Sequence, residues 1–137
     1  MKRFRTFPDE ALLIIRVILC LSFWVHGLAK YNMGLGNVAG FFGKQGIPMA
    51  SIAAPGITFL EIIGSVALLI GLGTRVFAAL LVCDMLGAIM FVHRHNGYMA
   101  QNGMELVTLL ATLALTLVLL GAGRYSVDAR LGRETTA

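Results

Sequence analysis

The sequence predicts an all-α membrane protein, built as a four-transmembrane-helix bundle. Of the 137 residues, 58% are hydrophobic and only 13% are charged, whereas about a quarter of the residues of an ordinary soluble domain are charged. The apolar residues also gather into four runs, each close to the roughly 20 residues that a helix needs to cross a bilayer. Because lipid offers the backbone no hydrogen-bond partners, a helix is the expected form of each run.

We expect a single membrane domain over residues 1–137, with spans at residues 10–31, 52–72, 75–93 and 104–121. The first span opens on Pro-Asp-Glu, which is typical of a helix start because Pro fits the first turn and acids offset the helix dipole. Each later span ends at glycine or at a polar turn, where a helix is expected to stop.

The connections between the spans differ in kind. Residues 32–51 are rich in glycine but not polar, and their middle, residues 38–42, predicts a short helix in the membrane interface. Gly73 and Thr74 leave room only for a tight turn, so the second and third spans are expected to form an antiparallel hairpin. A polar turn beginning at His93 joins the third span to the fourth.

The basic residues predict the orientation. The two termini and the Gly73–Thr74 turn share one side of the membrane, and seven of the basic residues lie there: Lys2, Arg3, Arg5, Arg75, Arg124, Arg130 and Arg133. The other side holds three, Lys30, Lys44 and Arg94. Because cytoplasmic loops are enriched in Lys and Arg, both termini are expected in the cytoplasm of a multi-pass protein of the bacterial inner membrane. The lipid bilayer is then the expected partner, and no nucleic acid is.

Three charged residues lie well inside the predicted spans, away from the span ends: Arg16, Glu61 and Asp84. Such a side chain costs roughly 2.5–3.5 kcal/mol at the bilayer centre on insertion scales, so these groups are expected to face one another inside the protein. We expect an intramembrane ion pair between Arg16 and Glu61, with Asp84 as a competing partner. The alternative for Arg16 is that its long side chain extends to the inner headgroups.

Four further polar residues lie near the outer boundary of the spans: His26, Lys30, His93 and Glu105. His26 and Lys30 are four residues apart and share a helix face. Glu105, at the start of the fourth span, is expected at about the same membrane depth as His93, at the end of the third span. We expect these four residues to form a polar binding site at the outer mouth of the bundle. There are two alternatives: that the Lys30 side chain extends outward to the lipid headgroups, and that His26 is a core residue hydrogen-bonded to a backbone carbonyl.

The third span poses a geometrical difficulty. Asp84 and His93 are separated by about 900° of helical rotation, which places them on opposite faces of a straight helix. We therefore expect either a helix contacted on two sides or a neutral Asp84. The small residues Ala79, Cys83 and Gly87 line a stripe beside Asp84 that suits close helix packing. The stripe favours a partner subunit or a homo-oligomer.

Several chemistries could use these residues. A quinone suits an apolar bundle with His and Lys at one end, because these side chains can hydrogen-bond a quinone oxygen while Glu passes on a proton. We favour it over a haem held by His26 and His93, and over a metal held by His93, His95 and Glu105. Cys20 lies far in sequence from the other cysteine with no CxxC, so the chain holds no dithiol redox motif.

A series of short motifs follows one another along the chain: Arg16, His26-Gly27, Lys30, Gly46-Ile47-Pro48, Glu61-Ile62-Ile63-Gly64, residues 71–75 (GLGTR), 88–93 (AIMFVH), Asn96-Gly97, Gly103-Met104-Glu105 and 121–128 (GAGRYSVD). In this order they resemble the DoxX family of small bacterial membrane proteins. The resemblance covers about residues 12–131. Single motifs of this kind are weak, but the ordered set is specific. Asp84 and His95 lie outside the pattern.

The resemblance implies a four-helix inner-membrane bundle linked to redox chemistry. The family takes its name from a subunit associated with thiosulfate:quinone oxidoreductase, and other members are linked to thiol-redox complexes or to the maturation of partner enzymes. It also implies that the 121–128 segment caps a helix end, with Ser126 and Asp128 bonding local backbone. We therefore expect the membrane subunit of a quinone-linked or thiol-redox oxidoreductase system. A non-catalytic scaffold or assembly factor is the alternative, and a small proton-coupled carrier comes third.

Overall fold

The computed structural model describes residues 6–133, and within that range it contains helices and no strands. The helices are α1 (Pro8–Met33), α2 (Leu35–Lys44), α3 (Ala50–Ile70), α4 (Thr74–Ala88), α5 (Glu105–Leu120) and α6 (Val127–Arg130). A π-helical turn, Ile89–His93, and a 3₁₀ turn, Arg94–Asn96, extend α4 without a break. The all-α prediction is confirmed.

Three helical segments are long and apolar enough to cross a membrane: Pro8–Met33, Ala50–Ile70 and Thr74–Asn96. The helix α5 is also apolar, but its 16 residues make it shorter. Many large apolar side chains on the outside of these helices are exposed, among them Ile14, Ile63 and Leu119. Because that surface suits lipid rather than water, the chain is a membrane protein.

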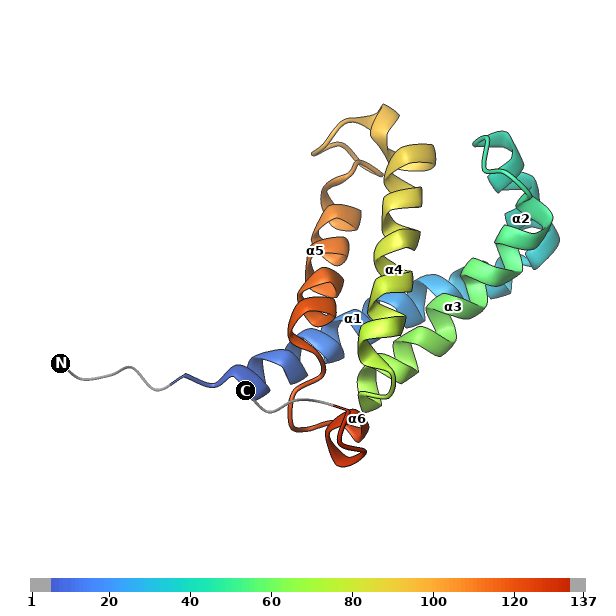
Figure 1. Ribbon diagram of the computed structural model, residues 1–137. Coiled ribbons are helices and arrows are strands. Elements are labelled where there is room, and N and C mark those ends of the chain that lie inside the picture. The colour runs from blue at the N-terminus through green and yellow to red at the C-terminus, as the bar shows by residue number, and fades with distance from the viewer. Residues whose placement is uncertain (1–5, 134–137) are drawn as a thin grey trace.

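The helices form two pairs (Figure 1). In one pair α1 lies along α3, and in the other α4 lies along α5, while α2 packs on the start of α3. The core between the pairs contains Leu19, Phe23, Leu68, Leu81 and Leu117, all fully buried. The loop between α4 and α5 lies at one end of the molecule, and α6 lies at the other.

At the α6 end, Arg16 ties three parts of the chain together. It is 1% exposed, and it donates hydrogen bonds to backbone carbonyls of Leu68 (2.7 Å), Leu69, Ala122 (3.1 Å) and Tyr125 (2.8 Å). The first two carbonyls belong to the last turn of α3, where carbonyls lack the usual partner four residues on; the Leu68 carbonyl also accepts from the N–H of Gly71, at 3.2 Å. Arg16 thus joins the start of α1 to the end of α3 and to the segment after α5.

The segment after α5 also holds the start of α4. Asp128 accepts hydrogen bonds from the backbone N–H groups of Gly73 (2.9 Å) and Thr74 (2.8 Å). Ser126 bonds locally, since it donates to the Gly123 carbonyl and accepts from the Ala129 N–H. The expected role of Ser126 in local capping matches these contacts, whereas Asp128 caps a helix more than 50 residues away in sequence.

Candidate functional site

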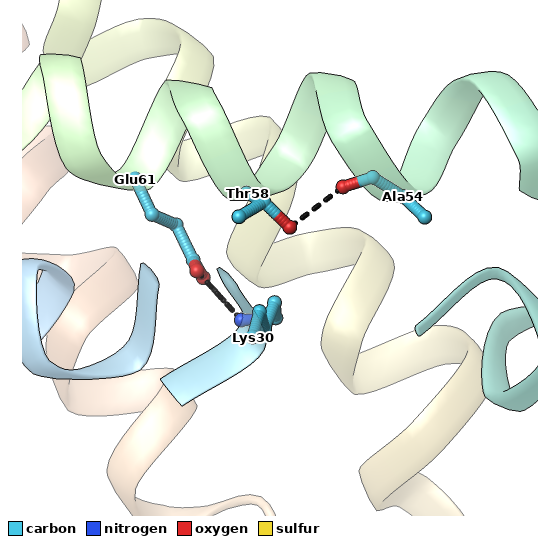
Figure 2. Close-up of polar contacts among 4 residues, drawn as sticks. All are labelled: Lys30, Ala54, Thr58 and Glu61. Carbon is cyan, nitrogen blue, oxygen red and sulfur yellow. Dashed lines mark hydrogen bonds and ion pairs between the residues drawn. The ribbon is translucent and has the colours of Figure 1, made fainter. Parts of the chain in front are cut away.

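An ion pair links the two helices of the first pair. The Nζ of Lys30, on α1, lies 2.8 Å and 2.6 Å from the two carboxylate oxygens of Glu61, on α3 (Figure 2). Glu61 is 2% exposed and Lys30 24%. One turn before Glu61, the Thr58 hydroxyl donates to the Ala54 carbonyl of its own helix, so it does not compete for the carboxylate.

A glycine allows α1 and α3 to approach closely at this level. A Cβ atom on Gly27 would lie 2.7 Å from Cγ1 of Ile62 and 3.1 Å from Cβ of Glu61. Small residues at helix contacts let two backbones come together in a membrane. Gly27 is therefore the reason that Lys30, one turn further along α1, lies against Glu61.

The partners of Arg16 and Glu61 differ from the predicted pairing. Gly27 lies opposite Glu61, while Arg16 lies opposite Gly71, near the end of α3. Arg16 and Gly27 are eleven residues apart in α1, or about 16 Å at 1.5 Å per residue. Glu61 consequently pairs with the lysine of the outer group, and Arg16 donates to carbonyls. The expected ion pair was based on membrane depths counted from the ends of the predicted spans, and these depths placed Arg16 and Glu61 too close together.

Asp84, on α4, faces the same ion pair. It interacts electrostatically with both Glu61 and Lys30. Its Oδ2 atom is buried and, among residues 6–133, has no hydrogen-bond partner. Since buried polar atoms are normally hydrogen-bonded, Oδ2 is an unsatisfied acceptor next to the ion pair.

The π-helical turn Ile89–His93 resolves the difficulty of the third span. A π-helical residue turns through a smaller angle than an α-helical one, so the face of the helix shifts across such a turn. As a result Asp84 and His93 line the same cavity. The Nδ1 of His93 lies 2.7 Å from the Asn102 carbonyl, which can only accept. Nδ1 is then the donor and Nε2 of a neutral ring is left as an acceptor.

The cavity has a volume of about 530 Å³ and lies between α1, α2, α3 and α4, with the start of α5 closing one side. Six of the polar residues singled out from the sequence line it: His26, Lys30, Glu61, Asp84, His93 and Glu105. The remaining wall is mostly apolar. Both the expected outer group and two members of the expected intramembrane group therefore meet at this one cavity, and Arg16 does not line it.

The burial of these groups changes along the cavity. Glu61 is buried, Lys30, Asp84 and His93 are partly buried, and the side chains of His26 and Glu105 are exposed. The polar groups thus run from the solvent- or lipid-facing mouth to a buried carboxylate.

Other residues of the wall were not predicted. Phe41, Phe42 and Phe91 supply aromatic surface, and Cys83 and Gly87, from the small-residue stripe, line the cavity as well. The sequence predicted a short apolar helix at residues 38–42, but nothing in it indicated that the aromatic residues of α2 would line a cavity. The two free cysteines are one buried residue, Cys20, and the exposed Cys83.

No group of three or more His, Cys, Asp and Glu side chains within residues 6–133 is arranged to hold a metal ion. His93 bonds the Asn102 carbonyl, and His95 is exposed and does not line the cavity.

Comparisons with known proteins agree with this fold. The DoxX family model matches residues 11–94. The chain is 35% identical over 105 residues to "Putative oxidoreductase CatD" of Bacillus subtilis (strain 168), covering 77% of this chain and 76% of CatD. It is 34% identical over 121 residues to an uncharacterized protein of Haemophilus influenzae, covering 85% of this chain and 87% of that protein.

An uncharacterized membrane protein of Mycobacterium tuberculosis is 30% identical over 138 residues, covering 93% of this chain and 85% of the relative. No solved structure matches the chain. The family match covers more than half of the 137 residues and includes α1 to the end of α4. The chain belongs to the DoxX family.

Proposed function

We propose that this protein is the membrane subunit of a quinone-linked or thiol-redox oxidoreductase system and that its cavity binds the ring of a quinone or a similar amphipathic compound. The convergence of six ionisable side chains on one largely apolar cavity carries the proposal. A volume of about 530 Å³ lies within the range of roughly 300–1,000 Å³ that small-molecule sites occupy. The name given to CatD, in which an oxidoreductase is suggested, supports the same class.

The residues of the cavity fit a ring with polar substituents. Phe91, Met85 and Leu110 offer an apolar and aromatic surface for the ring. The Nε2 of His93 and the Oδ2 of Asp84 are acceptors, so they could receive hydrogen bonds from the hydroxyl groups of the reduced, quinol form. Lys30 adds a positive charge that a quinone oxygen would meet favourably. These partners lie on different elements, so they would orient the ring as well as bind it.

The chemistry assigned to this chain is binding and proton transfer. Reduction of a quinone to a quinol takes two electrons and two protons. A partner redox subunit would have to supply the electrons, because Cys20 and Cys83 are free thiols in separate helices rather than a dithiol motif. The series from exposed Glu105 and His93 to buried Glu61 offers groups that can carry protons between the mouth and the ring.

We propose that the chain is a single membrane domain that crosses the bacterial inner membrane four times with both termini in the cytoplasm. The distribution of Lys and Arg supports this orientation. A helix of 16 residues rises about 24 Å, which is short of a hydrocarbon core of about 30 Å. The apolar residues that flank α5, such as Met104, would complete the fourth span.

A non-catalytic scaffold is the second proposal, and a proton-coupled carrier is the third. The scaffold was motivated by a third span with polar groups on two faces. In the structure Asp84 and His93 line one cavity, and so do Cys83 and Gly87 of the small-residue stripe. These residues therefore favour ligand binding over a docking face.

Quinone binding by the purified protein tests the first proposal. A short-chain benzoquinone and a short-chain naphthoquinone, each also in its quinol form, would be titrated while the fluorescence of Trp24, the single tryptophan, is recorded. Loss of one hydrogen bond weakens binding by roughly three- to ten-fold, so His93→Ala and Asp84→Ala should each weaken binding of the quinol by that factor. His95→Ala, outside the cavity, is the matched control. Absence of binding, or equal binding by all variants, would contradict the proposal.

A further inference from the structure

We propose that an anionic phospholipid headgroup binds at the end of the molecule opposite the α4–α5 loop, in a basic pocket next to α6. The basic pocket has a volume of about 290 Å³ and is lined by Ile70, Arg124, Tyr125, Ser126, Val127 and Arg130. This inference depends on the chain lying in a membrane and is independent of what the large cavity binds.

Two guanidinium groups of the basic pocket are available to an anion. Arg124 and Arg130 are both exposed. Lys30 and Glu61 form the one ion pair within 4.0 Å among residues 6–133. Neither Arg124 nor Arg130 is therefore paired with a carboxylate in that part of the chain. The guanidinium of Arg124 lies 5.2 Å from the centre of the Tyr125 ring, which restricts its position beside the basic pocket. Arginine forks bind phosphate oxygens with two parallel hydrogen bonds.

The nearby acidic groups are engaged elsewhere. Asp128 accepts from the backbone of Gly73 and Thr74, and Asp9 accepts from the backbone N–H of Arg124 at 2.9 Å. Glu10 accepts from the Tyr125 hydroxyl at 3.4 Å. These carboxylates reduce the positive potential, but among residues 6–133 none of them forms an ion pair within 4.0 Å with Arg124 or Arg130.

The position of the basic pocket favours a lipid over a free anion. The helices α3 and α5 end at Ile70 and Leu120. The side chains of Ile70, Leu119 and Leu120 are 45%, 67% and 60% exposed, so apolar surface reaches the rim. Beyond it the chain becomes polar, as expected at the level of the headgroups, and Tyr125 matches the aromatic residues of that layer. A phosphate on the arginines would thus place its acyl chains along exposed apolar side chains.

Lipid binding to the folded protein tests the inference. The protein would be placed in nanodiscs of neutral phosphatidylcholine and titrated with phosphatidylglycerol, with bound lipid counted by native mass spectrometry. Near a charged membrane surface, each basic residue changes affinity by roughly five-fold. The double variant Arg124→Gln/Arg130→Gln should therefore bind phosphatidylglycerol roughly 25-fold more weakly than the wild type. Arg94→Gln changes an exposed arginine at the opposite end of the molecule, in the α4–α5 connection; it is the matched control and should bind as the wild type does.

Inorganic phosphate distinguishes the two sources of the anion. Inorganic phosphate would be added at the same concentration as phosphatidylglycerol. If it displaced the lipid, the basic pocket would be a free-anion site and the lipid assignment would be overturned. Equal binding by the wild type and the double variant would overturn it as well. If the double variant did not fold, Arg130→Gln alone would be measured, with an expected loss of roughly five-fold.

Discussion

The Nζ of Lys30 bridges both oxygens of the Glu61 carboxylate, at 2.8 Å and 2.6 Å, and so joins α1 to α3 beside the large cavity. Both residues of this ion pair line the cavity, and the Oδ2 of Asp84, on α4, is buried there without a hydrogen-bond partner among residues 6–133. The position of the pair explains how a helix contact and a polar binding site occupy the same level of the molecule.

Removing the positive partner should destabilise the fold. Lys30→Met leaves the Glu61 carboxylate buried without its counter-ion, which is expected to lower the free energy of unfolding by about 3–5 kcal/mol. Lys30→Met/Glu61→Leu should recover most of that loss, since it removes both charges. Unfolding from mixed detergent and SDS micelles measures both effects, with exposed Lys44→Met as control. A Lys30→Met protein as stable as the wild type would show that the ion pair does not hold the helices.

A methyl group on Gly27 should separate α1 from α3. Its Cβ would lie 2.7 Å from Ile62, and overpacking of this kind costs about 1–3 kcal/mol. Gly56→Ala, on α3, meets nothing within 4 Å and should leave stability unchanged or slightly raised. Comparing the unfolding curves of these two variants checks the prediction. Equal stabilities would contradict the close approach at Gly27.

Replacing Arg16 by lysine should not preserve its contacts. A lysine ammonium is a single point charge on a flexible stem and cannot copy the fork that reaches the carbonyls of Leu68 and Ala122. Each lost hydrogen bond to a charged donor is worth about 1.5–3 kcal/mol, so Arg16→Lys should lower the free energy of unfolding by at least that amount. Arg75→Lys is the control, because exposed Arg75 donates one hydrogen bond, to the Val118 carbonyl. Similar losses in both variants would contradict the role given to Arg16.

Acid should weaken the cap that Asp128 provides. Burial raises the pKa of this carboxyl, but hydrogen bonds from the backbone of Thr74 and Gly73 outweigh burial and hold the pKa below its ordinary value of 3.8. The carboxylate therefore stabilises the fold fully above the pKa of the unfolded chain, and this stabilisation is lost as the pH falls through the lower folded value.

Asp128→Ala should accordingly lose about 0.5–2 kcal/mol at neutral pH. Its stability should also depend less on pH in the acid range, so that the two unfolding curves converge there. Unfolding measured from neutral pH downward tests both statements, with exposed Glu10→Ala as control. A constant difference between the wild type and Asp128→Ala at every pH would contradict the shift.

The helices could be predicted because composition, run length and the Pro8-Asp9-Glu10 start agree on them. The partners of Arg16 and Glu61 could not, since pairing in a membrane depends on the register of two helices to within a turn. Gly27 leaves no room for a side chain against Ile62, and no periodicity in the sequence reveals this close approach.

The cavity could be predicted in part. His26, Lys30, His93 and Glu105 were expected to lie together, and in the structure all four line one cavity; their role in binding stays a prediction. The presence of Asp84 in the same wall depends on the π-helical turn that follows α4. An extra residue in a helical turn leaves no recognisable pattern in the sequence, so a straight helix was the natural expectation.

Filling the cavity from Gly87 is the most direct test of the account. Gly87 lines the cavity, and a Cβ there meets nothing within 4 Å, so Gly87→Leu should fold while occupying the space of a ring. Gly56→Leu adds the same side chain outside the cavity and also meets nothing within 4 Å. Titration with the short-chain quinones should show binding by the wild type and Gly56→Leu, and none by Gly87→Leu. Wild-type affinity in a folded Gly87→Leu protein would contradict a binding site in this cavity.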